Sequence, residues 1–189
     1  TKHKLLWLIL IPGPFWTSYL LRVFAWKIIL GYNGVINSGL IELGLIEEPL
    51  VFLLYNNFAV VLTLAHAWAA FAILPIYVSL EKIDRSLLEA ATDLGDTPVM
   101  RFLRVTLPLS MPGLIAASLL VFIPTVGDYV TPRLVGGTNI MIGNVIQSMF
   151  GVSNNWPFGA ALSVIAMVAI TLIICLFLWG TSSYRRRVA

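Results

Sequence analysis

The sequence predicts an all-α integral membrane protein with four membrane-spanning helices, and composition and charge spacing support this fold class. Of 189 residues, 59% are hydrophobic and only 11% are charged, with a mean hydropathy of +0.91. An ordinary soluble domain carries about 25% charged residues. The few charges leave four long uncharged windows, and a spanning helix needs about 17–25 mostly apolar residues. This pattern disfavours a soluble enzyme, a disordered tail and a disulfide scaffold.

The first predicted span is Leu5–Leu21, the 17 uncharged residues between Lys4 and Arg22. Pro12 and Pro14 lie inside it, so we expect a kinked or tilted helix. The segment after it, from Val23 to Asn56, is mixed in character. Its glycines and asparagines predict turns. Its apolar run at 25–30 predicts a short helix at the membrane interface.

Three further uncharged windows hold 32, 23 and 51 residues. Their apolar parts predict the remaining spans, Asn57–Leu80, Leu109–Gly127 and Phe158–Gly180. The stretch between the last two, Thr131–Pro157, is rich in glycine and asparagine. Its moderately apolar middle, Ile140–Phe150, predicts a short helix lying on the outer surface.

Lysine and arginine divide unequally between the two sides of this topology. With the amino end of the segment in the cytoplasm, nine of them lie inside and three lie outside. The net charge is then +4 inside and −1 outside, and the total of +3 agrees with the composition. Cytoplasmic loops carry an excess of basic residues. We therefore expect the amino end and the carboxyl terminus inside, and the basic balance requires no nucleic-acid partner.

The inner loop between the second and third spans, residues 81–110, has the pattern of two short helices. Ser86 followed by Glu89 matches a capping box. Gly95 is placed to end the first helix. Thr97 and Pro98 are placed to begin the second, as N-cap and first helical residue. On this pattern alone, a solvated loop and a docking element remain equal alternatives.

The spacing within this loop resembles the cytoplasmic EAA loop of ATP-binding-cassette importer permeases. Glu89-Ala90-Ala91 is followed after three residues by Gly95, after nine more by Val105, and after one more by Leu107-Pro108. The family pattern prefers isoleucine at the position of Val105, a mild departure. Several fixed positions over a long spacing make the pattern specific.

Other segments along most of the chain resemble the spermidine/putrescine permease branch of the type I importers. They are 14–20, Arg22, 25–26, 34–37, 55–57, 83–88, 128–132 and 136–137. The resemblance implies a single transmembrane permease domain over residues 1–189 in a type I permease bundle. Such permeases usually have about six spans, so amino-terminal spans are expected to be missing from this segment, which begins at Thr1.

The resemblance also implies a role for the loop and a set of partners. The matching residues that would contact the ATPase are Glu89, Ala90, Ala91, Gly95, Leu107 and Pro108. The implied partners are an ATPase dimer, a second permease subunit and an external solute-binding protein, within the inner-membrane bilayer. The resemblance implies that the ATPase binds ATP and Mg²⁺, and it is consistent with this that the sequence has no phosphate-binding loop motif. No cofactor is expected in this chain.

Asp128 is the best candidate for a substrate-path residue, since ionisable groups within spans are rare. It ends the third span after Thr125, and Tyr129 follows it. A polyammonium substrate would need a carboxylate and an aromatic face. An interfacial aspartate paired with Arg133 is the equal alternative. Trp16, late in the first span, is a further candidate for the path.

Nothing in the sequence points to catalysis or a metal site. His66 has no carboxylate partner at helical spacing, so a hydrogen-bonded histidine is preferred over a path-lining one. The single Cys175 excludes an internal disulfide and disfavours a cysteine metal cluster.

The function predicted from the sequence is a permease subunit for polyamines. The nearest alternative is an importer permease for another small solute, amino-acid-like or phosphonate. An ATPase-independent transporter or channel, and a membrane scaffold, are less favoured because neither would use an ATPase-docking loop.

Overall fold

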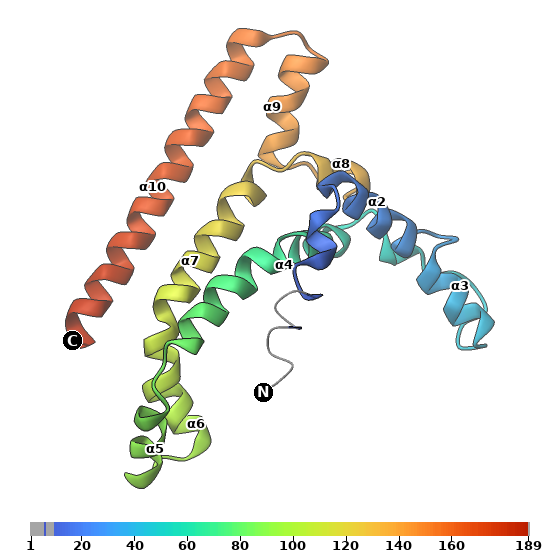
Figure 1. The fold of residues 1–189 in the computed structure, drawn as a ribbon. Coiled ribbons are helices and arrows are strands. Elements are labelled where there is room, and N and C mark those ends of the chain that lie inside the picture. The colour runs from blue at the N-terminus through green and yellow to red at the C-terminus, as the bar shows by residue number, and fades with distance from the viewer. Residues whose placement is uncertain (1–5, 7–9, 189) are drawn as a thin grey trace. The chain divides into compact units, whose positions relative to one another are not determined.

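The computed structural model describes residue 6 and residues 10–188, and every regular element in this part of the chain is helical (Figure 1). The all-α prediction is therefore confirmed. The elements in chain order are η1 (Gly13–Trp16), α2 (Tyr19–Leu30), α3 (Val35–Glu42), η2 (Val51–Leu53), α4 (Asn57–Glu81), α5 (Arg85–Asp93), α6 (Pro98–Arg101), η3 (Phe102–Thr106), α7 (Leu107–Val126), α8 (Val130–Val135), α9 (Ile142–Gly151) and α10 (Trp156–Val188).

Four helical stretches are long and apolar enough to cross a membrane, which makes this a multi-pass membrane protein. Three of them confirm the predicted second, third and fourth spans, but the third stretch begins at Pro98, 11 residues before the predicted Leu109. The four stretches are Tyr19–Glu42, Asn57–Glu81, Pro98–Val126 and Trp156–Thr181.

The predicted first span, Leu5–Leu21, is wrong at its carboxyl-terminal end. Residues Gly13–Trp16 form a single 3₁₀ turn, and the candidate span begins only at Tyr19. Prolines at the start of this turn lack the N–H that an α-helix interior needs. Residues 5 and 7–9 of the prediction lie outside the described residues.

A single charge, Arg22, was taken as the end of that span, but it lies inside α2. Its guanidinium donates a hydrogen bond to the carbonyl of Ala67, so the charge is accommodated within the helix pair. The apolar run at 25–30, predicted as a separate interfacial helix, is the second half of α2. Helix α3 follows after a short break and was not predicted.

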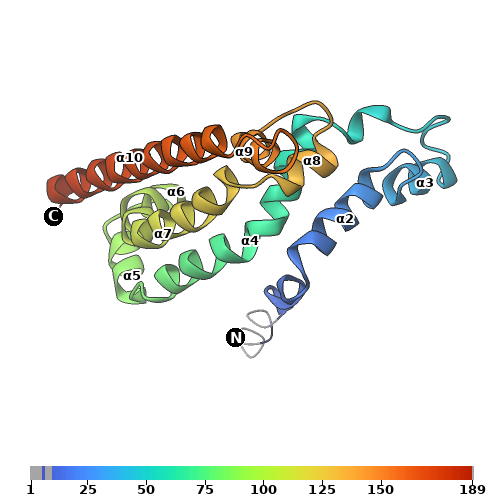
Figure 2. The same ribbon diagram turned by 90° about the horizontal axis from the view of Figure 1, so that it is seen from above.

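The chain divides into two units, and the first contains Thr1–Arg22 and Leu64–Phe122. Within it, α4 and α7 lie side by side (Figures 1 and 2), and Gly113 of α7 faces Pro75 and Ser79 of α4. A Cβ atom at Gly113 would lie 2.5 Å from the carbonyl oxygen of Pro75 and would also clash with the side chain of Ser79. A glycine is therefore required at this helix crossing.

The second unit contains Val23–Thr63 and Ile123–Ala189. Its buried polar centre is Asn37, which accepts a hydrogen bond from the Leu50 amide at 2.8 Å. The Asn37 amide group donates to the carbonyls of Gly31 and Leu50. These bonds hold the turn before α3 against the segment that follows it.

Helices α9 and α10 lie side by side in the second unit (Figure 1). The rings of Phe150 and Trp156 meet edge to face at 5.5 Å where α9 turns into α10. The helix predicted at Ile140–Phe150 is thus confirmed as α9. None of the apolar window of α10 is buried in this chain, so this helix is free to face lipid or another subunit.

Candidate functional site

We call residues 82–106, between α4 and α7, the α5–α6 loop. Helix α5 begins at Arg85 because Asp84 is extended and its Oδ1 accepts a hydrogen bond from the Ser86 amide at 3.0 Å. The predicted capping box of Ser86 and Glu89 is therefore wrong by two residues. An aspartate that directly precedes the helix took the N-cap position. The hydrogen bonds from Ser86 hold the pKa of the Asp84 carboxyl below its ordinary value.

The predicted end of α5 at Gly95 is confirmed. Gly95 has φ +86°, a left-handed conformation that favours glycine. Its amide donates to the Thr92 carbonyl at 2.9 Å, and the Asp96 amide donates to the Ala91 carbonyl at 3.0 Å. This bond pair is a Schellman motif, which satisfies carbonyls that the helix end leaves open.

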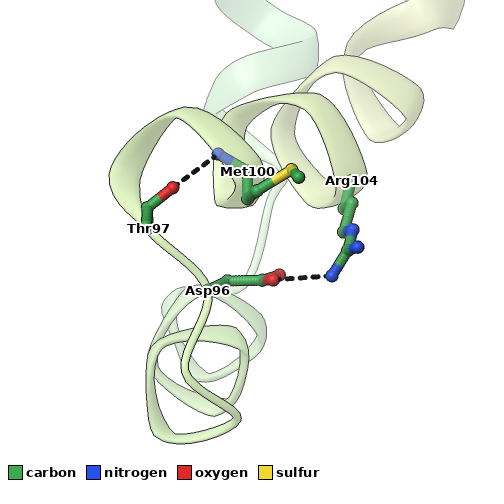
Figure 3. A network of polar contacts seen from close by, with 4 residues as sticks. All are labelled: Asp96, Thr97, Met100 and Arg104. Carbon is green, nitrogen blue, oxygen red and sulfur yellow. Dashed lines mark hydrogen bonds and ion pairs between the residues drawn. The ribbon is translucent and has the colours of Figure 1, made fainter.

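The second helix of the loop begins as the sequence predicts. Thr97 is the N-cap of α6, and its hydroxyl accepts from the Met100 amide at 3.3 Å (Figure 3). Pro98 is the first helical residue. Arg104 forms an ion pair with Asp96 at 2.7 Å across the turn (Figure 3). Because α6 continues through η3 into α7, the second half of the loop is a direct extension of a spanning helix.

Five of the six predicted ATPase-contact residues are at least partly accessible. Glu89, Ala90 and Gly95 are exposed, and Leu107 and Pro108 are half-buried at the start of α7. Ala91 differs, since only 6% of it is exposed and it faces the interior of the loop.

Sequence reasoning missed Leu94, which is 87% exposed at the end of α5. A large apolar side chain in this position is a contact candidate because water disfavours it. A cavity of about 370 Å³ also lies in the loop, lined by Arg85, Leu88, Glu89, Thr92, Asp93 and Arg101. Its walls combine both charge signs with apolar surface.

The second candidate region is the corner at residues 127–131, where α7 gives way to α8. Asp128 is buried, and its Oδ1 accepts hydrogen bonds from the amides of Val130 at 2.9 Å and Thr131 at 3.4 Å. The carboxylate thus holds its own backbone in place. Tyr129 beside it is 44% exposed.

Helix α9 supports this corner from a distance in sequence. The Asn144 side chain donates to the Tyr129 carbonyl at 2.7 Å. A Cβ atom at Gly143 would lie 2.8 Å from the Gly127 carbonyl oxygen and 2.9 Å from that of Asp128. Neither Gly143 nor Asn144 was predicted as a site residue, because their contacts with the corner cannot be read from the residues next to them in sequence.

The four predicted path residues divide between the two units. Asp128 and Tyr129 are adjacent in the second unit, and the Asp128 amide donates to the carbonyl of Thr125 at 3.2 Å. Trp16 belongs to the first unit and is 86% exposed. His66 lies in the first unit as well, where its ring stacks on Phe15.

No group of three metal-ligating side chains is close enough to hold an ion within the residues that the structure describes.

The sequence model of the binding-protein-dependent transport system inner membrane component family matches residues 5–187 of this chain. The chain belongs to this family. The EAA-type spacing that the sequence analysis identified therefore occurs in a member of a transport-permease family, as the resemblance implied.

Several curated members of this family are similar to the chain. The spermidine/putrescine transport system permease protein PotB of Haemophilus influenzae is 42% identical over 188 residues, which are 99% of this chain and 65% of that protein. PotB of Escherichia coli is 40% identical over 182 residues, 96% of this chain and 66% of that protein. The inner membrane ABC transporter permease protein YdcU of Escherichia coli is 36% identical over 90% of this chain. The chain spans just under two thirds of the length of the two PotB proteins.

Proposed function

We propose that this member of the binding-protein-dependent transport family is the transmembrane permease subunit of an ATP-driven importer. Residues 1–189 form its permease domain, and the α5–α6 loop and both ends of the segment face the cytoplasm. The observation that carries the proposal is the α5–α6 loop itself. It is a pair of helices capped by its own residues, with exposed Glu89 and Ala90, and it connects α4 to α7.

The connections of the loop suit it to transmit a mechanical push. Helix α6 runs through η3 into α7 without an intervening coil. Helix α4, which enters the loop, is packed against α7 at the Gly113 crossing. A displacement of the loop by a partner would therefore move α4 and α7 together in the first unit. We assign the ATPase contact to Glu89, Ala90, Gly95 and Leu94, with Ala91, Leu107 and Pro108 supporting the shape of the loop.

The proposed partners are those of a binding-protein-dependent transport system. A second permease subunit completes the translocation path. An ATPase dimer binds the α5–α6 loop, and it supplies the ATP and Mg²⁺ chemistry. An external solute-binding protein delivers the substrate to the opposite face of the membrane.

We further propose that the substrate is a polyamine such as spermidine or putrescine. Similar relatives carry those substrates in their names. The α7–α8 corner offers the matching chemistry, a carboxylate at Asp128 beside the half-exposed ring of Tyr129. A cation binds aromatic faces and carboxylates, so Tyr129, Trp16, Thr125 and Asp128 form the proposed path residues.

A different solute is the rival that the structure itself supports. Asp128 is buried and accepts two backbone amides, which is a sufficient structural reason for a carboxylate at this position. If Asp128 has only this structural role, the corner does not select for a cationic substrate. The cargo would then be another small molecule, such as an amino-acid-like or phosphonate solute.

The test is ATP hydrolysis and uptake by the full-length permease, reconstituted in proteoliposomes with its ATPase, second permease and solute-binding protein. We expect spermidine or putrescine to stimulate hydrolysis and to accumulate in the vesicles. Gly95→Asp should retain complex assembly and lose stimulation, with Gly95→Asn as the milder control. Stimulation by an amino acid or a phosphonate alone would support the rival. Substrate flux without an ATPase would contradict the proposal.

A further inference from the structure

The proposed path does not use Arg22, a charged residue inside a candidate span. Ionisable groups in spanning segments are rare and indicate function by default. The Nη1 atom of Arg22 donates to the Ala67 carbonyl at 3.0 Å. Its guanidinium carbon lies 4.9 Å above the ring centre of Phe15 and 5.9 Å from that of Tyr19. The charge is therefore held by one carbonyl and two aromatic faces, all within the first unit.

Phe15 lies between this guanidinium and a second ring. His66 stacks on it with a centroid distance of 5.8 Å and an interplanar angle of 26°. Both His66 and Ala67, the partner of Arg22, belong to α4. Arg22, through its bond to Ala67, and His66 thus attach Phe15 to α4 at residues 66 and 67.

The turn that contains Phe15 has little stability of its own. Element η1 covers Gly13–Trp16, and the Phe15 amide donates to the Pro12 carbonyl at 2.8 Å. A single helical turn is unstable alone because fixing its dihedral angles costs more than one bond returns. The stacked group of Arg22, Phe15 and His66 therefore fixes where this turn lies.

Trp16 follows Phe15 in the same turn and is 86% exposed. Fixing Phe15 fixes the backbone from which the exposed Trp16 side chain projects. Tyr19, Trp68 and Phe71 form a further aromatic run in the first unit, with ring centres 5.6 Å apart in each successive pair. An open indole face is the strongest aromatic partner for an ammonium group.

We propose that Arg22 is a positioning residue for Trp16 and that it thereby sets the affinity of the permease for a cationic substrate. The proposal rests on the proposed function, since it requires Trp16 to contact a cation. It assigns Arg22 no contact with the substrate. A planar guanidinium both stacks on Phe15 and donates to Ala67, whereas a lysine ammonium can donate to Ala67 but has no planar face for Phe15. Arginine is therefore required, and not merely a positive charge.

The experiment measures uptake kinetics of spermidine by the complete reconstituted importer. Trp16→Ala should raise KM about tenfold by loss of the cation–π contact, with little change in the maximal rate. Arg22→Gln should raise KM by a similar factor, and Arg22→Lys by less. Adding Arg22→Gln to Trp16→Ala should raise KM no further, because both changes remove the same contact. Phe15→Leu provides a second variant that removes the stack and should act like Arg22→Gln.

Other outcomes overturn the inference. An unchanged KM in Arg22→Gln, or in Trp16→Ala, excludes a positioning role that acts through Trp16. Independent, additive effects in the double variant show that Arg22 acts by another route. If Arg22→Gln fails to assemble with the ATPase, Phe15→Leu decides in its place by the same criteria. Failure of the proposed function is distinguished by the wild-type complex, which would then show no spermidine-stimulated hydrolysis.

Discussion

The α5–α6 loop and the α7–α8 corner both reverse or bend the chain at the end of a spanning helix, but they are stabilised by opposite means. The loop is held by neighbours in sequence, through the Asp84 and Thr97 caps and the left-handed Gly95. The corner is held by a buried carboxylate and by Asn144, 15 residues further along the chain. A loop that is stabilised by its own neighbouring residues can expose its side chains to a partner. In the corner, the Asp128 carboxylate accepts hydrogen bonds from the backbone beside it.

This difference separates two kinds of candidate residue. In the loop, removing Glu89 or Ala90 should leave the fold intact, since both are exposed and neither caps a helix. In the corner, Asp128 combines the proposed substrate contact with hydrogen bonds to the backbone amides of Val130 and Thr131. Substitutions that preserve the hydrogen bonds of Asp128 and remove its charge are therefore needed to distinguish the structural role from the substrate contact.

The largest effect on stability is expected at the corner. Asp128→Ala leaves one part-buried and one buried backbone amide without this acceptor, which should cost about 2–3 kcal/mol. Asp128→Asn keeps the Oδ1 acceptor and should cost less than about 1 kcal/mol, while polyamine uptake falls. Thermal unfolding of the purified complex, followed by circular dichroism, measures the loss of stability in each variant. Equal destabilisation by alanine and asparagine would show that the charge, and not the acceptor, holds the corner.

The next effect is expected at Gly95 in the loop. Gly95→Ala forces a side chain into the left-handed conformation and should cost about 1–2 kcal/mol locally. No atom would contact the added Cβ, so the cost is conformational and not steric. Asparagine tolerates this conformation better, and Gly95→Asn should cost less. Hydrogen exchange of the α5 amides should detect the change. An alanine variant with unchanged exchange would contradict the role of the positive φ.

A smaller effect is expected at the start of α6. Thr97→Ala removes the hydroxyl that accepts from the Met100 amide and should cost about 1 kcal/mol. Thr97→Ser keeps the hydroxyl and serves as the control. Faster exchange of the α6 amides in the alanine variant alone would support the cap. Equal exchange in both variants would show that Pro98 and the Asp96–Arg104 ion pair suffice.

The smallest effect concerns pH. The hydrogen bonds from Ser86 lower the pKa of Asp84. The ionised Asp84 cap therefore stabilises α5 fully when the pH is above the ordinary pKa of aspartate, about 3.9. This contribution is lost as pH falls through the lowered pKa of the folded state. Protection of the α5 amides should stay level at higher pH and fall in acid. Asp84→Asn should remove the acid step, and an unchanged step would assign it to another group.

The sequence predicted the loop better than the amino-terminal region, for a physical reason. Gly95, Thr97 and Pro98 act on their own helix ends, so their roles can be read from neighbouring residues. Even here, the N-cap of α5 was misplaced because Ser86 and Asp84 both fit the pattern. Local signals identified the helix and left its first residue ambiguous.

The first span failed because its determinants are not local. Arg22 was taken as the end of a span, yet the Ala67 carbonyl, 45 residues away, and the Phe15 ring hold it inside the helix. Asn37 and Asn144 also act through distant backbone groups, and their sequence surroundings resemble ordinary turns. Conversely, Ala91 was grouped with Ala90 by the motif, but only packing reveals that it is buried.

Site-directed cross-linking from the α5–α6 loop to the ATPase tests the central claim most directly. Cys175 is the one cysteine of these 189 residues, so a cysteine-free background that includes Cys175→Ser allows single cysteines at Ala90, which is exposed, and Ala91, which is buried. In the assembled complex, we expect Ala90→Cys to cross-link to the ATPase with a yield that changes on ATP binding, and Ala91→Cys to react poorly. No cross-link from Ala90→Cys in a complex that hydrolyses ATP would contradict the account.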